Sequence, residues 1–318
     1  MSYVYGNGDL QNVSRQTIYT SMLQRRFRDW LLGQKLMNDR TAEFPDGDTA
    51  QFDQIGQRSL KLRSENTAVD FSKLDTSRIQ LTVTDQYQDG FYMTDEAKED
   101  SWKSDMLWAA NVEESMLAFD RQLETDILAT SNQQVLGDLN VIAGESHRVI
   151  GSGASQVIAL DDIRRMKLAF DKARIPAQGR VLLVDPSVEF TLNGLIDLNA
   201  NVNDGNSSVM GMINTGFGNQ NQFLTNFYGF SIIISHQLPR IVDETIDGEQ
   251  ILGGVANIAM SMASADATPF MGVIRRAPVA EFDRNTSFRR DEWSMTSRWG
   301  FALQRPESLG VIITKESV

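Results

Sequence analysis

The chain has 318 residues, 41% hydrophobic and 23% charged, which is typical of a soluble globular protein large enough for one big fold or two subdomains. It contains no cysteine, which excludes disulfides and thiolate metal sites and fits synthesis in a reducing cytoplasm. The net charge of -12 argues against broad binding of nucleic acid, because such binding needs clustered Lys and Arg. No apolar run approaches the roughly 20 residues that span a bilayer, so we expect no membrane segment.

Residues 1–40 predict a helix from Arg15 to Met37, because apolar residues recur at helical spacing and a locally basic face lies opposite. Two interpretations stay open. The helix is an arm that docks on a neighbouring subunit or a scaffold, or it packs on its own domain with solvated arginines. The residues that define the two faces are Ile18, Met22, Phe27 and Trp30 on one, and Arg15, Arg25, Arg26, Arg28 and Lys35 on the other.

Between Thr41 and Met93 the pattern changes to the alternation typical of strands. The segment from Gly56 to Ser77 is polar and offers few residues for a core. A two-stranded excursion of this kind is marginal alone in water, so we expect it to lie on another surface. An ordinary surface hairpin is the alternative. The alternating stretches are Ser59–Arg63, Ile79–Thr84 and Gly90–Thr94.

A long helix is predicted from Thr94, a candidate N-cap, to about Thr130. Glu113, Glu114 and Glu124 fall on its other faces, and we expect Glu113 and Glu114 to be solvated. Neighbouring helical residues diverge by about 100°, so Glu113 and Glu114 do not form a paired carboxylate site. The apolar stripe consists of Ala109, Val112, Met116, Phe119, Leu123 and Ile127.

The only two histidines, His147 and His236, have neither a partner histidine nor a cluster of carboxylates beside them, so we predict no metal site. The next stretch predicts a helix from Asp161 to Ile175, capped by one of its first two aspartates and ended by proline. A buried strand, Val181–Val184, and a second helix, Ser187–Leu198, follow. No phosphate-binding loop follows the strand and no nucleophile stands beside a base, so nothing catalytic is predicted.

The remaining third of the chain predicts mainly strands. A long loop, a strong strand and an acidic, turn-rich segment come first, then a further strand, an exposed charged segment and a closing element with aromatic residues. In that order these are Asn199–Gln222, Tyr228–Ser235, Arg240–Gly254, Asn257–Met262, Arg284–Glu292 and Trp293–Ile313.

Three stretches carry a family resemblance: LDDIRRMKLAFDKARIPAQGRVLLVDPSVEFTL, GFSIIISHQLP and the turn Arg305-Pro306-Glu307. They resemble the major capsid proteins of tailed bacteriophages, which have the Hong Kong 97-type coat fold, and the similarity covers most of Phe44 to Ile313. The resemblance implies an α+β fold. Its parts would be an N-terminal arm (1–40), an extended hairpin called the E-loop (41–94), a peripheral domain with a spine helix (95–180, with a C-terminal return at 284–318) and an axial domain (181–283).

The same resemblance implies a coat protein that self-assembles into hexamers and pentamers of an icosahedral shell, enclosing double-stranded DNA without sequence-specific binding. Its expected partners are itself, a portal protein, a decoration protein and a separate scaffolding protein, since no acidic coiled-coil-like segment precedes the fold. The expected location is the virion capsid, assembled in the host cytoplasm. Two alternatives are an encapsulin-like nanocompartment shell and a soluble α/β enzyme with an unrecognised site.

No catalytic, cofactor-binding or metal residue is predicted. The predicted contacts between subunits come from the arm, the E-loop and the charged segment near the end of the chain. They are Arg25, Arg26, Phe27, Trp30, Lys61, Arg63, Lys73, Arg289 and Arg290.

Overall fold

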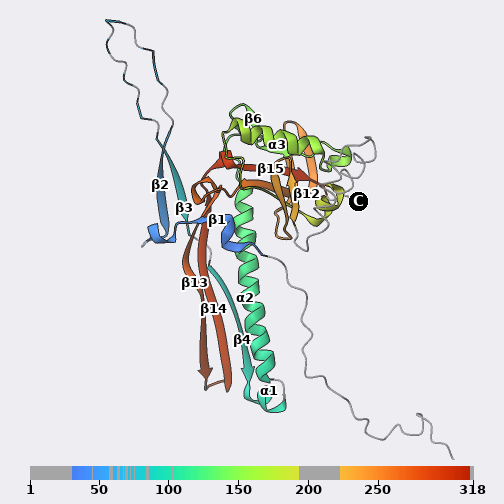
Figure 1. The fold of residues 1–318 in the computed structure, drawn as a ribbon. Helices are drawn as coiled ribbons and strands as arrows, with labels where there is room; N and C mark the ends of the chain where they lie inside the picture. The colour runs from blue at the N-terminus through green and yellow to red at the C-terminus, as the bar shows by residue number, and fades with distance from the viewer. Residues whose placement is uncertain are drawn as a thin grey trace, which may run out of the picture. The chain divides into compact units, whose positions relative to one another are not determined.

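The computed structural model describes residues 31–192, except 45, 57–59, 63–64, 67, 69–70, 72, 75, 84–85 and 102–103, and residues 223–315 (Figure 1). The chain divides into two compact units, Met1–Trp30 and Leu31–Val318. All described residues belong to the second unit. The predicted loop Asn199–Gln222 and most of the predicted N-terminal helix lie outside the described residues.

The described end of that helix differs from the prediction. Residues 33–36 form a short 3-10 helix, η1 (Gly33–Leu36), and strand β1 (Met37–Asp39) follows at once. Strand β1 pairs in parallel with residues 270–272, far along the chain. The helical pattern therefore ends before Met37, because residues 37–39 pair with a distant strand instead. The local sequence does not encode this long-range pairing.

The first sheet has four strands in the order β1-β13-β14-β4, with β13 (Phe270–Asn285), β14 (Arg290–Leu303) and β4 (Gln86–Thr94). The long helix α2 (Ser104–Ala129) lies beside these strands (Figure 1). Trp299 of β14 donates from Nε1 to the Asp126 carboxylate of α2 at 2.8 Å and stacks on Tyr87 of β4. These contacts fix the helix to the sheet.

The long predicted helix is two helices. Thr94 caps α1 (Asp95–Asp100) as predicted, since its hydroxyl accepts from the Ala97 N–H at 3.3 Å. Ser101 then adopts an extended backbone, with φ -106° and ψ 109°, and α2 starts at Ser104. The predicted apolar stripe is buried only in its second half, at Phe119, Leu123 and Ile127, whereas Ala109 and Met116 are exposed.

The second sheet has the order β7-β15-β12-β8-β10-β9, with β11 paired to β12. Its strands run in both directions, parallel for β8 with β10 and antiparallel for β12 with β8 and β15. The predicted buried strand is confirmed as β8. The bounds are β7 Arg148–Ile150, β8 Arg180–Val184, β9 Phe223–Phe227, β10 Phe230–Ile234, β11 Arg240–Ile246, β12 Glu249–Ser261 and β15 Leu309–Thr314.

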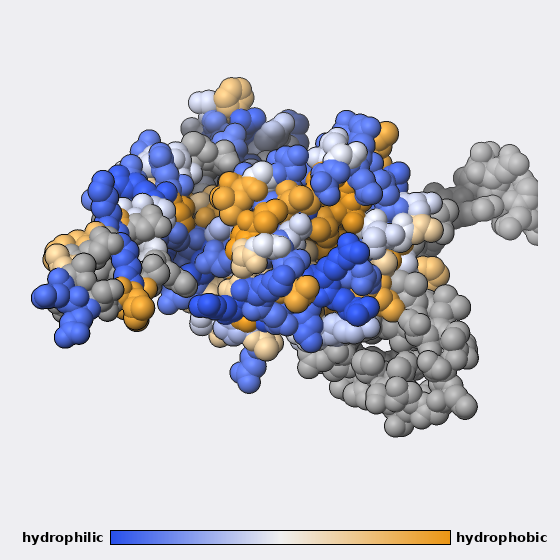
Figure 2. Space-filling model, turned by 90° about the horizontal axis from the view of Figure 1, so that it is seen from above, coloured by the Kyte–Doolittle hydropathy of each residue, from blue (hydrophilic) through white to orange (hydrophobic). Residues whose placement is uncertain are grey.

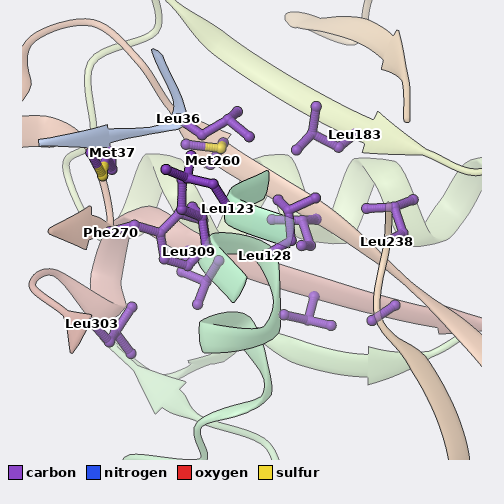
Figure 3. Packing of buried hydrophobic residues seen from close by; sticks show 14 of the residues in the cluster. Leu36, Met37, Leu123, Leu128, Leu183, Leu238, Met260, Phe270, Leu303 and Leu309 are labelled. Carbon is purple, nitrogen blue, oxygen red and sulfur yellow. The ribbon is translucent and has the colours of Figure 1, made fainter. Parts of the chain in front are cut away.

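Strand β8 shows how this sheet separates two cores. Leu182 and Val184 pack with helix α3 (Leu160–Lys172) and the helix at residues 186–192, whereas Val181 and Leu183 pack with α2 and the first sheet. Successive side chains of a strand point to opposite faces, so one short apolar run serves both cores. Figure 3 shows the core between this sheet, α2 and the first sheet, where side chains from five elements converge: Leu36, Leu123, Leu183, Met260 and Phe270.

Two further predictions need correction. The predicted turn-rich segment Arg240–Gly254 is the β11–β12 hairpin, turning at Asp247 and Gly248, and β12 continues through the strand predicted at Asn257–Met262. Helix α3 begins at Leu160, so neither Asp161 nor Asp162 is its N-cap. Asp162 instead lies in the first turn, where its carboxylate accepts from the Ala159 N–H at 2.9 Å.

A separate two-stranded hairpin, β2 (Thr49–Ile55) with β3 (Thr76–Thr82), forms where alternation predicted strands, although residues 60–62 of the Ser59–Arg63 stretch are not in a strand. Strand β4 pairs with β14 and not with this hairpin. The remaining short elements are η2 Thr41–Glu43, η3 Thr130–Asn132, β5 Val141–Ile142, β6 Glu145–Ser146, η4 Ala154–Gln156, η5 Ala265–Ala267 and η6 Pro306–Ser308.

Candidate inter-subunit surfaces

The base of the β2–β3 hairpin is fixed to the rest of the subunit. Leu81 and Val83 are 1% exposed and pack in one cluster with Met271 and Val273 of the first sheet. Gln54 of β2 adds a hydrogen bond, donating from Nε2 to the Gln304 carbonyl at 3.0 Å. The hairpin therefore has a definite origin on its own subunit.

The far end of the hairpin is different. Leu60, Leu62 and Phe71 are 103%, 101% and 89% exposed, so these apolar side chains are covered by nothing in the described part of the subunit. The sequence predicted a polar tip, and the structure shows that the segment also presents large apolar groups to solvent. Fully exposed apolar side chains grouped in one loop indicate a surface that binds another molecule.

Two of the predicted contact residues, Lys61 and Lys73, lie in the same loop and are exposed. Arg25, Arg26, Phe27, Trp30 and Arg63 lie outside the described residues. The loop therefore combines exposed lysines with exposed apolar groups, and in an interface the lysines would lie in the polar rim around an apolar centre.

The last two predicted contact residues lie at the end of the β13–β14 hairpin. Arg289 is exposed in the turn with φ 48°. Arg290 donates from Nε to the Glu292 carboxylate at 2.6 Å, and its guanidinium lies 4.3 Å from the ring centre of Tyr92 and 4.9 Å from that of Phe288. Tyr92 and Phe288 are 60% and 67% exposed, so this end of the sheet presents aromatic rings as well as charge.

Beside it lies an ion cluster that the sequence pattern did not reveal. Arg284 donates to both carboxylate oxygens of Asp95, at 2.6 and 2.7 Å, and to Asp291 at 2.8 Å, and Lys98 also pairs with Asp291. The hydrogen bond from Arg284 holds the pKa of Asp95 below its usual range. The cluster ties the start of α1 to the β13–β14 hairpin, and only the tertiary pairing brings Asp95 next to Arg284.

Glu124 of α2 lies outside the predicted apolar stripe, yet the residue is 0% exposed. Its carboxylate accepts hydrogen bonds from the backbone N–H groups of Leu32 and Gly33, at 2.6 and 3.1 Å, and from the Ser235 hydroxyl at 3.0 Å. A buried carboxylate is tolerated only when hydrogen bonds replace its hydration. Glu124 therefore fixes the point where the described chain begins against α2.

In the ranges that the structure describes, no helix is both long and apolar enough to cross a bilayer. No three His, Cys, Asp or Glu side chains of those ranges are grouped so that they could hold a metal ion.

The described chain thus combines a long helix packed on a four-stranded sheet, a second mixed sheet and an extended hairpin with an apolar end. The family model described as phage capsid protein matches residues 79–313. The chain belongs to the phage capsid protein family. This membership confirms the resemblance drawn from the sequence and favours a phage coat protein over the nanocompartment and enzyme alternatives.

Solved capsid structures show the same fold at low sequence identity. The mature capsid of bacteriophage PhiM1 is 12% identical with a TM-score of 0.70, covering 100% of this chain and 97% of that one. The capsid of cyanophage P-SCSP1u is 14% identical with a TM-score of 0.68, covering 98% and 96%. A Mycobacterium phage Che8 structure is 14% identical with a TM-score of 0.64, covering 95% and 97%. No curated protein sequence matches the chain. The expected α+β Hong Kong 97-type fold is confirmed.

Proposed function

We propose that this phage capsid protein is the major coat protein, assembling as hexamers and pentamers into an icosahedral shell around the double-stranded DNA of a tailed phage. The observation that carries the proposal is the exposure of Leu60, Leu62 and Phe71 at the end of a hairpin whose base is firmly packed. Full burial of one such side chain is worth about 1.5–3 kcal/mol. A neighbouring subunit that covers all three gains a substantial contact that a lone subunit lacks.

Other surfaces fit many repeated contacts. Figure 2 shows hydrophobic areas bordered by hydrophilic ones on the face it presents. Exposed apolar residues also occur on α2, at Met106 and Met116, and at the end of the β13–β14 hairpin, at Phe282 and Phe288. Weak contacts of this kind suffice in a shell, because each is repeated in every copy.

Within the proposal the role is structural and not catalytic, which membership in a family of capsid proteins supports. Within the proposal the partners are a portal protein, a separate scaffolding protein and a decoration protein, and the shell forms in the host cytoplasm. The coat protein itself has a net charge of -12, so a wall built from it can enclose DNA without binding it tightly. The proposed domains are the arm (1–40), E-loop (41–94), peripheral domain (95–180 and 284–318) and axial domain (181–283).

The test removes the far end of the hairpin. Deleting residues 57–75 leaves the packed base in place, so the variant should stay folded while closed shells disappear in electron microscopy. A milder variant, Leu60→Ser with Leu62→Ser and Phe71→Ser, should lower shell yield in the same direction. Its matched control is Val242→Ser with Leu252→Ser, since these residues are 86% and 60% exposed on a different hairpin. Normal shells from the deletion variant would refute the role given to the hairpin.

A further inference from the structure

The outer side of helix α3 carries a surplus of positive charge. The helix covers one face of the second sheet, where its apolar side packs with Leu182 and Val184 of β8 (Figure 1). Its other side is exposed and rich in arginine and lysine. The exposed cations are Arg164, Arg165, Lys167 and Lys172, and Arg174 comes directly after the last capping residue.

The two carboxylates on the same side of the helix each have a cation of their own. Asp161 pairs with Arg165, at 2.8 Å from Oδ2 to Nε. Asp171 pairs at 2.7 Å with Arg180 of β8, whose side chain is 2% exposed. Residues 160–180 contain six cations and three carboxylates, a net charge of +3, which leaves -15 for the rest of a chain whose total is -12. The outer side of α3 is therefore a local basic surface on an acidic protein.

Three of the five exposed cations keep their charge open to a ligand. Arg164 approaches Asp161 only to 3.5 Å, and its side chain is 63% exposed. In the part of the chain that the structure describes, the side chains of Lys167 and Arg174 are exposed and have no ion-pair partner. The other two cations are each paired with a carboxylate.

Duplex DNA fits this surface better than an acidic protein does. A protein interface has an apolar centre, but the exposed side of α3 offers a single large apolar residue, Leu168, which is 46% exposed. Phosphate groups need no apolar centre and are bound by arginine and lysine side chains. The 13 residues of α3 extend over about 20 Å, and a DNA strand presents one phosphate every 3.4 Å or so along its axis. Several phosphates can therefore meet the open cations.

We infer that the outer side of α3 contacts the phosphate backbone of the enclosed DNA, through Arg164, Lys167 and Arg174. The inference rests on the proposed function, since it needs a shell filled with DNA, and it makes the α3 side of the second sheet the side that faces inward. The contact is weak in each copy, because few phosphates are neutralised and the rest of the chain is acidic. Every copy repeats it, without preference for a base sequence.

DNA-filled particles test the contact directly. Formaldehyde joins lysine amines to nearby bases, so filled particles are treated, opened and digested, and the peptides that carry nucleotides are identified by mass spectrometry. The peptide with Lys167 should be linked to DNA at several times the yield of the peptide with Lys35, an exposed lysine of η1. Equal yields, or no DNA on Lys167, would overturn the inference.

Two further treatments distinguish the enclosed DNA from other partners. A carbodiimide joins lysine directly to a carboxylate. If it couples Lys167 to another protein in filled particles that show no DNA link, an acidic protein occupies α3 and the inference is wrong. Duplex DNA added outside closed, empty shells should not be linked to Lys167 by formaldehyde. A link there would place α3 on the outer surface, which also contradicts the inference.

Charge variants measure how many phosphates are bound. Lys167→Gln with Arg174→Gln should reduce the slope of log binding constant against log salt by about 1.8 for the free subunit at low salt, since each phosphate contact contributes about 0.9. Lys35→Gln with Arg276→Gln is the matched control, because it removes the same charge from side chains exposed elsewhere, and its slope should not change. Equal slopes in the two variants, or no binding by the unmodified subunit even at low salt, would refute the contact.

Failure of this inference is distinct from failure of the proposed function. Filled particles without DNA on Lys167 refute the role of α3 and leave the coat function intact. If the unmodified chain forms no DNA-filled particles with its phage partners, the proposed function itself is wrong.

Discussion

Arg148 and Glu244 form a two-point ion pair, with 2.6 Å from Nε to Oε1 and 2.7 Å from Nη2 to Oε2. The side chain of Arg148 is 1% exposed and that of Glu244 is 12% exposed. Arg148 belongs to β7, which pairs with β15, and Glu244 belongs to β11, which pairs with β12. The pair therefore joins two strands of the second sheet that share no backbone hydrogen bonds.

Removing one partner of this pair should be costly. Arg148→Met leaves a largely buried carboxylate without its cation, so we expect a loss of about 3–5 kcal/mol in the free energy of unfolding. Adding Glu244→Leu to Arg148→Met should restore much of that loss, because the charge that lacks a partner is then gone. Denaturant unfolding of the two single variants and the double variant measures the coupling. Equal stability of Arg148→Met and the double variant would show that burial of Glu244 is not the cause.

The pair also predicts an acid limit. Burial alone would raise the pKa of Glu244, but the hydrogen bond and charge of Arg148 outweigh it, so the pKa lies below its usual value. A carboxylate whose pKa is lower in the folded state stabilises fully above its unfolded pKa, about 4.3, and this contribution is lost as the pH falls. The drop in stability between pH 5 and pH 3 should therefore be smaller in Glu244→Gln. An unchanged drop would contradict this.

His147 predicts a second pH dependence in a different window. The residue is 1% exposed, its Nδ1 lies 3.2 Å from the Glu145 carbonyl oxygen, and its Nε2 has no hydrogen-bond partner in the described structure. Loss of hydration lowers the pKa of His147. As the pH falls, His147 therefore takes up its proton more readily in the unfolded chain than in the folded one. The free energy of unfolding declines below about pH 6.5, the ordinary pKa of histidine.

The experiment compares melting at pH 7.5 and pH 5.5. His147→Gln should reduce the difference seen in the unmodified protein. The other histidine of the chain, His236, is exposed, so His236→Gln serves as the control and should leave the difference intact. If both variants behave alike, burial of His147 does not govern this window.

Glu124 gives a prediction about the start of the described chain. Glu124→Ala removes the acceptor for the Leu32 and Gly33 N–H groups, so we expect a loss of about 1–3 kcal/mol and faster proteolysis near those residues. Ser235→Ala is the matched control, because it removes the third hydrogen bond to the same carboxylate and leaves the two backbone bonds. Cleavage at an unchanged rate in Glu124→Ala would mean that this anchor does not hold the segment.

The charge of the chain predicts weak binding to DNA. The unassembled subunit, with a net charge of -12, should bind duplex DNA negligibly at moderate salt. Assembly should still respond to salt through ion pairs between subunits, each worth about 0–1 kcal/mol when exposed. A filter-binding or fluorescence titration decides the first point and light scattering the second. Tight, salt-sensitive DNA binding by the free subunit would contradict the proposed wall.

The sequence by itself determined the local elements and the family. The Thr94 cap and the buried strand at residues 181–184 follow from residue type and spacing, and the structure contains both. These features depend on neighbours along the chain, so periodicity and turn chemistry are enough to predict them.

Only the tertiary structure decided what depends on distant residues. Glu124 looks like a solvated helix residue until the chain 92 positions earlier delivers the Leu32 N–H group to it. Arg284 meets Asp95 across 189 positions, and Gln54 of β2 donates to the Gln304 carbonyl across 250 positions. A local pattern records which residues are polar or apolar. It does not record which distant partner removes water from them, and that partner decides whether a charge is buried, paired or free to bind another subunit.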